Sequence, residues 1–297
     1  MAIHLATRTL AAIDAAIRKD GGNLFRYHLG LVMPTAADAY DHTASEYRAH
    51  LGASLLGKDC AREIWYSWRW WTLAAHESRM YRLFNRGHLE EPRFVAMLRA
   101  SGVQVWQYDE NGKQFRISDH DGFFGGSLDG VALGVPDAPD VPLLSEFKTH
   151  NQKSFNKLVA DGLIRSKLQH YVQTTLYMGY RQLAGALYMA VNKDDDELYA
   201  ELVPFNSETF NRFRQRAAGI IASLTPPPRI KEDPQWYQCR FCDHRAACHK
   251  GAPALKTCRS CINVTRKGAG VWGCVLTGAA LTKDQQLAGC SQHREIR

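Results

Sequence analysis

The chain lacks several features that define large classes of proteins. Its 297 residues contain no apolar run near the ~18 residues that a membrane-spanning helix needs. Residues 1–23 mix apolar and charged residues at helical spacing without a small-residue cleavage site. Internal repeats, long low-complexity segments and a GxxxxGK(S/T) loop are also missing. We therefore expect a globular cytoplasmic protein that does not enter a membrane and has no helicase motor.

Most of the chain has no net positive charge and little cysteine. Residues 1–228 contain 25 Lys and Arg against 25 Asp and Glu, so the formal charge of +7 arises wholly from residues 229–297. That tail also contains seven of the eight cysteines, and Cys60 alone lies upstream. Without a secretory signal, closely spaced cysteines indicate metal ligation rather than a disulfide framework.

Composition and turn residues divide the chain into three regions. Residues 1–80 read mostly as helix and end in a segment crowded with tryptophan, which predicts a packed core with base stacking as the alternative. Residues 81–225 alternate helix and strand signals, and the proline-rich run that begins at Thr225 marks the start of a cysteine-rich region, 226–297. The tryptophans are Trp65, Trp68, Trp70 and Trp71.

The middle region has the pattern of a mixed α and β fold. A helical stretch is followed by four strand-like segments, which predict an antiparallel meander with a turn at Asn111-Gly112. Amphipathic helical patterns, a strand pair around an acidic turn and a further helix come next. In chain order, these segments are 86–102, 103–110, 113–122, 125–134, 141–149, 154–183, 185–205 and 206–224.

Carboxylates and one lysine gather around two of the predicted strands. Side chains two apart share a strand face, so Glu146 and Lys148 point the same way while Phe147 faces the opposite, buried side. If the strand at 125–134 pairs with this one, Asp129 reaches the same edge. Carboxylates suit a hard cation such as Mg²⁺, which neutralises a phosphodiester while a nearby lysine orients the attacking water. On an exposed strand, Glu-x-Lys is otherwise a solvated ion pair.

This pattern resembles that of the PD-(D/E)xK nuclease superfamily, in which one strand carries a carboxylate and the next carries (D/E)-x-K. The resemblance implies an α/β (α+β) fold with a restriction-endonuclease-like central mixed sheet flanked by helices. It implies catalytic roles for Asp129, Glu146 and Lys148. It also implies that Mg²⁺ or Mn²⁺ is held by Asp129, by Glu146 and by the main-chain carbonyl of Phe147.

A helical motif is similar to one in the lambda-exonuclease, YqaJ and RecB branch of that superfamily. The string Gly87-His-Leu-Glu-Glu91-Pro resembles the GxxxE(P) helix of this branch. The resemblance implies that Glu91 is a further catalytic residue and metal ligand. Glu90 and His88 are the alternatives for that role, and whichever residues do not fill it are ordinary polar residues of the helix surface.

A second helical motif matches the same branch. Gln173-Thr-Thr-Leu-Tyr177 resembles its QxxxY helix, with both side chains on one helical face. The resemblance implies that Gln173 and Tyr177 belong to the catalytic site and position the DNA strand. Gln169 competes for the glutamine role, and a tyrosine at helical spacing among apolar residues can equally belong to a core.

Three cysteines of the tail form a compact C-x2-C-x5-C cluster, and the upstream cysteine can supply the missing fourth thiolate. This order resembles the iron–sulfur members of the RecB-like nucleases, including AddB and the CRISPR-adaptation nucleases. The resemblance implies a 4Fe–4S cluster that fastens the N-terminal region to the tail segment 239–248. Zinc is the alternative metal, with His244 and His249 as substitute ligands. The four cysteines are Cys60, Cys239, Cys242 and Cys248.

A second set of cysteines has the two-knuckle spacing of a zinc ribbon over 256–293. The spacing predicts Zn²⁺, either as a folding staple or within a DNA-contacting ribbon. His293 can replace one thiolate. The cysteines are Cys258, Cys261, Cys274 and Cys290.

The tail's cations have two candidate roles. The string VTRKGAGVWGC predicts a hairpin with a turn at Lys267-Gly268. We expect Arg259, Arg266 and Lys267 to contact DNA phosphates, and the alternative is that they offset the negative charge of metal thiolates.

Together these features predict a metal-dependent DNA exonuclease, similar to phage-encoded recombination nucleases. Its partners would be single- or double-stranded DNA ends, a single-strand annealing or recombination protein, and a second copy of the chain. We expect it in the cytoplasm, which for a phage-encoded protein is the cytoplasm of the host. One alternative is a CRISPR-adaptation-type nuclease that trims DNA ends. The other is a non-catalytic DNA-binding adaptor on a nuclease scaffold.

Overall fold

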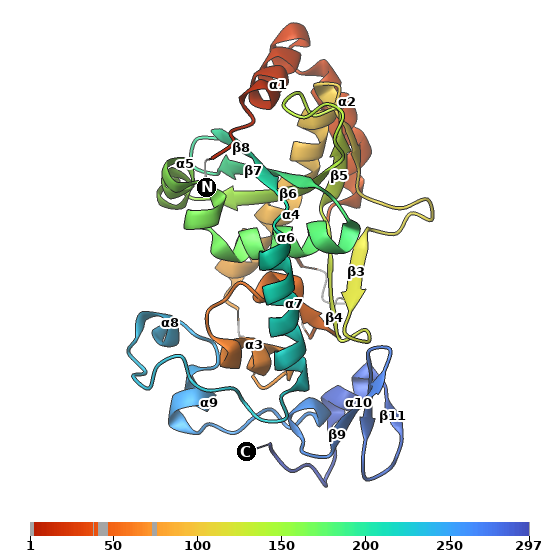
Figure 1. The fold of residues 1–297 in the computed structure, drawn as a ribbon, viewed down its shortest axis with the longest axis vertical. Helices are drawn as coiled ribbons and strands as arrows, with labels where there is room; N and C mark the ends of the chain where they lie inside the picture. Colours follow the sequence, from red (N-terminus) through yellow and green to blue (C-terminus); the bar gives the residue numbers. More distant parts are fainter. Residues whose placement is uncertain (1–2, 38, 41–46, 73–75, 297) are drawn as a thin grey trace. The chain divides into compact units, whose positions relative to one another are not determined.

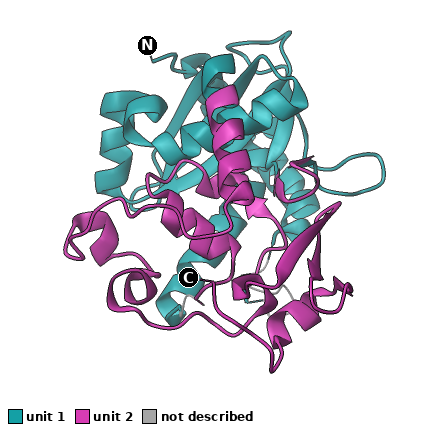
Figure 2. Cartoon of the chain, turned by 60° about the horizontal axis from the view of Figure 1, so that its bottom comes forward, with its two compact units in different colours: residues 1–44, 76–117, 127–210 teal, residues 45–75, 118–126, 211–297 magenta. Residues whose placement is uncertain are grey.

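The computed structural model describes residues 3–37, 39–40, 47–72 and 76–296. The chain forms two compact units, coloured separately in Figure 2. Each unit is assembled from three stretches of sequence, so the predicted helical region 1–80 contributes to both. Unit 1 comprises residues 1–44, 76–117 and 127–210, and unit 2 comprises residues 45–75, 118–126 and 211–297.

Unit 1 contains a five-stranded mixed sheet in the order β2-β5-β6-β7-β8 (Figure 1). Strands β6 and β7 are parallel, and the other neighbours are antiparallel. The strands are β2 (Gln104–Trp106), β5 (Gly130–Leu133), β6 (Leu143–His150), β7 (Gly185–Asn192) and β8 (Leu198–Pro204). The helices are α1 (Thr7–Asp20), α2 (Asn23–Val32), η1 (Met33–Thr35), α4 (Ser78–Ala100), α5 (Gln152–Ser166) and α6 (Leu168–Arg181).

The core of unit 1 lies on this sheet. Every residue of β7 is buried, as expected for a strand covered on both faces. Helix α4 packs on β6 through Phe94, whose ring stacks on that of Phe147 with centroids 5.0 Å apart. The mixed α and β fold, with a central mixed sheet and flanking helices, is therefore as the sequence predicts.

The predicted meander is wrong in one respect. Strand β2 pairs directly with β5, so two intervening strands leave the sheet. They are β3 (Arg116–Asp119) and β4 (Phe124–Ser127), which form a separate sheet in the order β1-β4-β3 with the parallel strand β1 (Leu51–Gly52). The turn between β3 and β4 has three consecutive residues with positive φ, His120, Asp121 and Gly122, and alternation along the sequence carries no information about which sheet a strand joins.

The helical pattern predicted at 154–183 forms two helices. Gly162 in α5 has φ +70° and ψ 174°, which interrupts the helix. The N–H of Leu163, freed from the helical pattern, donates to the Glu201 carboxylate at 2.9 Å. The predicted strand pair at 185–205 is confirmed as β7 and β8.

Unit 2 contains short helices and a small antiparallel sheet in the order β11-β10-β9. Its strands are β9 (Val264–Gly268), β10 (Val271–Cys274) and β11 (Ala280–Leu281), so the predicted hairpin forms, with its turn after Gly268. The helices are η2 (Ala53–Leu55), α3 (Ala61–Trp68), α8 (Tyr237–Arg240), α9 (Arg245–Lys250), η3 (Cys258–Ser260) and α10 (Lys283–Ala288); α7 (Ser207–Ala222) begins in unit 1.

The four clustered tryptophans belong to the core of unit 2. Each is at most 3% exposed, so the packing prediction is confirmed and base stacking is wrong for them. Trp65 and Trp71 contact each other, and Trp68 contacts Trp272 of β10 with ring centroids 5.2 Å apart. Aromatic packing thus joins α3 to the hairpin.

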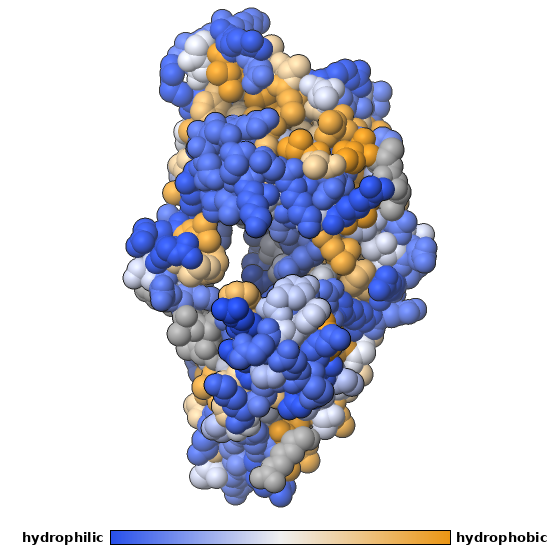
Figure 3. All heavy atoms as spheres, turned by 90° about the vertical axis from the view of Figure 1, so that its left-hand side faces the viewer, coloured by the Kyte–Doolittle hydropathy of each residue, from blue (hydrophilic) through white to orange (hydrophobic). Residues whose placement is uncertain are grey.

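Hydrophilic side chains cover much of the face drawn in Figure 3, and hydrophobic ones show in patches, mainly in the upper half of that view. Leu24, Tyr27 and Leu31 of α2 are exposed at spacings that share one helical face. Phe25 and Leu29 pack instead against the core. No helix in the described residues is both long and apolar enough to cross a membrane.

Arg259 should be essential to the stability of unit 2. It is 1% exposed and donates to Gln286 Oε1 at 2.9 Å and to the carbonyls of Arg48, Ala49 and Trp68 at 2.7–3.4 Å. Arg259→Met leaves these acceptors unpaired and should destabilise the protein by about 3 kcal/mol or more. Thermal unfolding followed by circular dichroism measures this, with the exposed Lys267→Met as control; equal melting temperatures would contradict it.

Candidate functional site

Strand register builds the first part of the site in unit 1. β5 and β6 are antiparallel, with Gly130 opposite Ser145. Asp129 directly precedes β5, and its Oδ2 accepts the N–H of Phe147 at 2.8 Å. The pairing that the sequence left conditional therefore exists, and it brings Asp129 to the strand that carries Glu146 and Lys148.

Glu146 and Lys148 form an ion pair inside the unit. The Lys148 amine donates to Glu146 Oε1 and to the Phe147 carbonyl at 3.0 Å, and it lies 3.8 Å from Asp129 Oδ2. Glu146 is fully buried, and its second oxygen, Oε2, has no hydrogen-bond partner. A buried carboxylate oxygen without a donor is costly unless a cation or donor completes it.

Helix α4 supplies a third carboxylate, and the geometry favours Glu91 over its neighbour. Glu91 interacts electrostatically with Asp129, Lys148 and Glu146. Glu90 instead pairs with Arg93, at 3.3 Å. His88 lines the same pocket as Glu91, and its Nδ1 is buried without a partner.

Burial and neighbouring carboxylates raise the pKa values of two glutamates, Glu91 and Glu146. Burial is the main cause for Glu91, whose pKa rises to about 8, and the charges of Asp129 and Glu146 add to it while Lys148 opposes it. Burial also raises the pKa of Glu146, against the effect of Lys148. For Lys148, burial disfavours the charged form, but Glu146 and Asp129 outweigh it and raise the pKa of the amine. Lys148 is thus an ammonium group held between carboxylates.

Sequence reasoning missed a polar wall beside these residues. A pocket of about 400 Å³ is lined by Glu91 and Lys148 and also by His150, His170 and Lys167. Both imidazoles contact the Tyr188 hydroxyl, His150 at 3.1 Å and His170 at 2.9 Å. Burial and nearby lysines lower the pKa of His150 to about 4 and that of His170 to about 2, so both rings are neutral.

Strand alternation could have found one of these residues. His150 follows Lys148 by two positions on β6, so the rule that aligns Glu146 with Lys148 also includes it. Lys167 donates to Ser154 Oγ at 2.7 Å, and that hydroxyl contacts His150 Nδ1 at 3.2 Å. This lysine lies in the break between α5 and α6, which helical periodicity did not predict.

Gln173 and Tyr177 both lie on α6, which also carries the pocket residue His170. Tyr177 is 3% exposed and belongs to the buried residues of unit 1, which favours its packing alternative. Gln173 is half-buried.

The carboxylate cluster beside this pocket, formed by Glu91, Asp129 and Glu146, fits a hard cation. Three carboxylates, one with a buried oxygen that lacks a donor, face a single ammonium group. Mg²⁺ and Mn²⁺ prefer such oxygen ligands. Within the described part of the chain, no group of three or more His, Cys, Asp or Glu side chains is arranged to hold a metal as it stands, so coordination would require side-chain adjustment.

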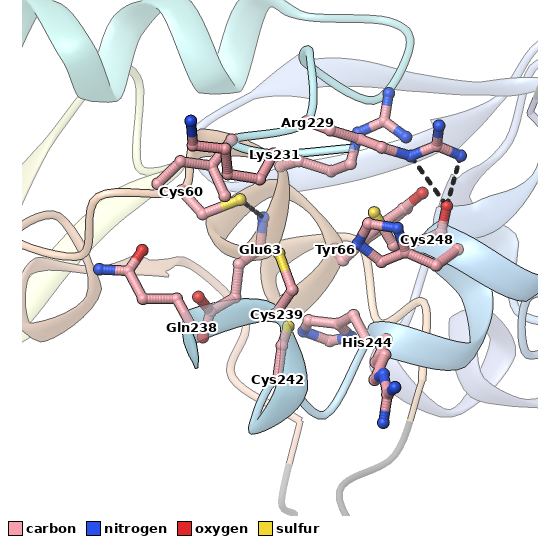
Figure 4. A pocket seen from close by; sticks show the side chains of 14 residues that line it. Cys60, Glu63, Tyr66, Arg229, Lys231, Gln238, Cys239, Cys242, His244 and Cys248 are labelled. Atoms are coloured by element: carbon pink, nitrogen blue, oxygen red, sulfur yellow. Dashed lines mark hydrogen bonds between the residues drawn. The ribbon is translucent and has the colours of Figure 1, made fainter. Parts of the chain in front are cut away.

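The first cysteine set shares one pocket of unit 2, drawn in Figure 4. The pocket brings the single upstream cysteine next to the three of the C-x2-C-x5-C cluster. Cys60 caps α3, and its sulfur accepts the N–H of Glu63 at 3.4 Å. Burial raises the pKa of Cys242 to about 12, and Cys60 adds to the shift. The four cysteines in the pocket are Cys60, Cys239, Cys242 and Cys248.

His244 lines this pocket but is already engaged. Its Nε2 contacts Ser67 Oγ at 2.9 Å, and its Nδ1 contacts Thr72 Oγ1 at 2.5 Å. Both ring nitrogens of His244 therefore already have hydroxyl partners, which favours Cys60 over His244 as the candidate for a fourth ligand. His249 also lines the pocket.

The second cysteine set lines another pocket of unit 2, together with His293. Burial and the three neighbouring thiols raise the pKa of Cys258. Main-chain hydrogen bonding from Thr277 lowers the pKa of Cys274, which favours its thiolate. His293 Nε2 contacts Ser260 Oγ at 2.9 Å. The cysteines of this pocket are Cys258, Cys261, Cys274 and Cys290.

One of the expected phosphate contacts is wrong. Arg259 is buried and bound to main-chain and side-chain oxygens, so it cannot reach DNA. Arg266 and Lys267 are exposed, although Arg266 donates to the Ile221 carbonyl at 2.7 Å. Spacing along the sequence does not distinguish a buried arginine from an exposed one.

Comparison with known proteins finds similarity in structure alone. No protein-family description and no curated protein matches the sequence. An alkaline exonuclease of Laribacter hongkongensis is 14% identical, with a TM-score of 0.44 over 59% of this chain and 88% of that one. The same enzyme in complex with dAMP is 15% identical, with a TM-score of 0.44 over 59% of this chain and 87% of that one. The structure of SSO0001 is 13% identical, with a TM-score of 0.38 over 74% of this chain and 95% of that one.

The raised pKa of Glu91 predicts a pH dependence of stability. Between its ordinary value of 4.5 and about 8, the folded state holds a proton that the unfolded state releases. The free energy of unfolding should therefore fall as pH rises through this window. We expect the melting temperature to fall less steeply between pH 5 and pH 8.5 in Glu91→Gln than in the wild type.

The exposed Glu197→Gln serves as the control, because it removes a carboxylate of the same unit outside the pocket. Its pH profile should match that of the wild type. Identical slopes for Glu91→Gln and the wild type would show that Glu91 is not held protonated in the folded state.

Proposed function

We propose that this chain is a metal-dependent deoxyribonuclease that hydrolyses phosphodiester bonds. One observation carries the proposal: Glu91, Asp129 and Glu146 converge with Lys148 in unit 1, and the second oxygen of the buried Glu146 lacks a donor. Such a cluster is unfavourable for stability alone, because like charges and desolvation both oppose it. It is suited to chemistry that needs a divalent cation beside a phosphate.

The residues of the chain have separable tasks. Mg²⁺ or Mn²⁺, held by Glu91, Asp129, Glu146 and the Phe147 carbonyl, would neutralise the phosphodiester and make water more acidic. The N–H of Phe147 fixes the Asp129 carboxylate. Lys148, held by Glu146, can orient the attacking water and stabilise negative charge that develops on the phosphate.

The rest of the pocket supports a phosphate-bearing substrate. Lys167 is a cation on the pocket wall, and the neutral rings of His150 and His170 add polar surface without negative charge. DNA as the substrate and exonuclease action rest on the sequence motifs, as does the strand-positioning role of Gln173 and Tyr177. So do a role in phage recombination or repair, a cytoplasmic location, a recombination partner and self-association.

The catalytic proposal predicts loss of cleavage from isosteric changes. Asp129→Asn, Glu146→Gln, Lys148→Met and Glu91→Gln should each lower the cleavage rate of end-labelled single- or double-stranded DNA by at least about 100-fold. Because these groups act as one unit, the Asp129→Asn, Glu146→Gln double variant should be little worse than either single change. Gel analysis over time also separates stepwise shortening from internal cuts.

Glu90→Gln is the matched control, because it alters the adjacent carboxylate that pairs with Arg93. It should retain activity. EDTA should stop cleavage and added Mg²⁺ restore it. Near-normal cleavage by Asp129→Asn would refute the assignment, and DNA binding without cleavage in the wild type would favour a non-catalytic adaptor.

We further propose that the two cysteine pockets hold different metals. The approach of Cys60 to Cys239, Cys242 and Cys248, with His244 engaged elsewhere, supports a four-thiolate 4Fe–4S site, and zinc is the alternative. The favoured thiolate of Cys274 and the two-knuckle spacing support Zn²⁺ at the second set. Both sites would stabilise unit 2 by linking distant segments.

These assignments predict that substitution of one cysteine removes one metal and leaves the other bound. Protein purified without oxygen should absorb broadly near ~400 nm and contain about four iron atoms and one zinc per chain. Cys60→Ser should remove the colour and keep the zinc, whereas Cys258→Ser should do the reverse. Elemental analysis and absorbance spectra measure this; a colourless preparation with about two zinc ions would contradict the iron–sulfur site.

A further inference from the structure

Unit 2 contains a polar pocket that neither the nuclease chemistry nor the cysteine sites use. It has a volume of about 430 Å³ and lies between the end of α3, the turn before β4, the end of α7 and the hairpin β9–β10. Two arginines, Arg69 and Arg266, line it together with His120, Asp121 and Trp272. Pockets of this size accommodate small ligands.

Arg69 is the unusual residue of this pocket. It is 4% exposed, and its guanidinium carbon lies 5.3–5.6 Å from the rings of Trp65, Trp68 and Trp272. Its Nε is buried without a hydrogen-bond partner. Stacking on aromatic rings stabilises a guanidinium in part, but donors without acceptors leave a large desolvation cost.

Arg259 shows what a structural arginine looks like in the same place. It stacks on the same Trp272, with its guanidinium carbon 4.8 Å from the ring centroid, and is equally buried. All three of its nitrogens donate to oxygens of unit 2. Arg69 also packs on Trp272 but lacks such acceptors, so the fold pairs the donors of one guanidinium and leaves the buried Nε of the other unpaired.

Charge balance around the pocket is incomplete. In the described residues, no Asp or Glu forms an ion pair with Arg69, Arg259 or Arg266. The carboxylate of Asp121 also lines the pocket, but its Oδ1 accepts the N–H of Ala269 at 2.9 Å. Burial lowers the pKa of Arg69 to about 10, and Arg266 adds to the shift, as expected for cations lacking a counter-charge.

The wall of the pocket is built at a conformational cost. His120 and Asp121 have φ of +48° and +57°, values that L-residues with side chains rarely adopt. The turn is held by the hairpin tip, where the Gly270 N–H donates to the Asp121 carbonyl at 2.7 Å. A Cβ on Gly122 would lie 2.6 Å from the Gly270 nitrogen, so the close approach requires glycine. Strain of this kind persists where surrounding contacts impose it, often at binding sites.

We propose that this pocket binds a phosphate group, with Arg69 and Arg266 as its ligands. A guanidinium matches the geometry of phosphate oxygens, and an anion there would supply both the missing acceptors and the missing charge. The group belongs either to free phosphate or a mononucleotide, or to the backbone of a DNA strand. The proposal does not depend on the nuclease assignment, because all of its residues lie in unit 2.

One competing role must be separated from this one. The charge of Cys261, a residue of the second cysteine set, interacts with Arg69. Arg69 would then serve as the counter-ion of a metal thiolate site. In that case its loss would reduce zinc content and stability whether or not phosphate is present.

Phosphate binding is tested on the full chain carrying Asp129→Asn, without added Mg²⁺, so that cleavage does not interfere. Isothermal titration calorimetry with inorganic phosphate, against chloride of equal ionic strength, should show saturable binding. In this background, Arg69→Gln should weaken phosphate affinity by about 10- to 100-fold. Arg266→Gln should weaken it by about threefold or more. Arg212→Gln, which removes an exposed positive charge of unit 2 outside the pocket, should leave it unchanged.

Melting temperature and zinc content complete the test. Phosphate should raise the melting temperature of the parent but not of Arg69→Gln, and zinc content should be equal in both. Absence of saturable binding, affinity insensitive to both arginine variants, or loss of zinc in Arg69→Gln would overturn the proposal. If Arg69→Gln does not fold, unchanged affinity in Arg266→Gln overturns it.

Two further ligands identify the source of the phosphate. Thymidine monophosphate and a short oligothymidylate are titrated into the parent and Arg69→Gln. Weakened binding of both supports a contact with the DNA backbone. Weakened binding of the mononucleotide alone supports a site for a free phosphate or nucleotide. If neither ligand binds more weakly to Arg69→Gln, the site does not bind phosphate.

Discussion

The antiparallel pairing of β5 with β6 is the constraint on which the candidate active site depends. Gly130 lies opposite Ser145, which places Asp129 against the Phe147 N–H and beside the face of Glu146 and Lys148. A slip of one residue would turn that face to the opposite side of the sheet. The same register aims Phe147 at Phe94, and Glu91, one helical turn earlier on α4, then reaches the other carboxylates.

That arrangement concentrates charge where a stable fold would avoid it. Glu91, Asp129 and Glu146 share one ammonium group in a buried place, and the raised pKa values of Glu91 and Glu146 show that their charged forms are disfavoured without a metal. The surrounding core compensates, because β7 is buried throughout and packs along the whole of β6. Marginal local stability at a pocket, supported by an apolar sheet, is the usual cost of assembling reactive groups.

Unit 2 presents the opposite imbalance. Its core brings together buried arginines around Trp272, and no carboxylate of the described residues pairs with them. The main-chain carbonyls of Trp68 and Ala49 accept hydrogen bonds from Arg259 and so stabilise its buried charge. Arg69 has no such acceptors. Its charge is therefore left for a metal thiolate site or a bound anion to balance.

The sequence predicts what depends on local periodicity and fails where distant segments decide. Alternation on β6 was enough to align Glu146 with Lys148 and to bury Phe147, and extending it by two residues would have added His150. No local pattern shows that β3 and β4 join a different sheet, because β4 pairs with β1, a strand more than sixty residues upstream.

Arg259 and Arg69 make the same point more sharply. Both are arginines in basic or aromatic strings, which read as surface cations, yet both are at most 4% exposed. What separates them is whether carbonyls from residues 48–49 and 68 reach the guanidinium. That difference is set by tertiary packing around Trp272. A charge count along the tail therefore overstates its basic surface, because it includes the buried Arg259.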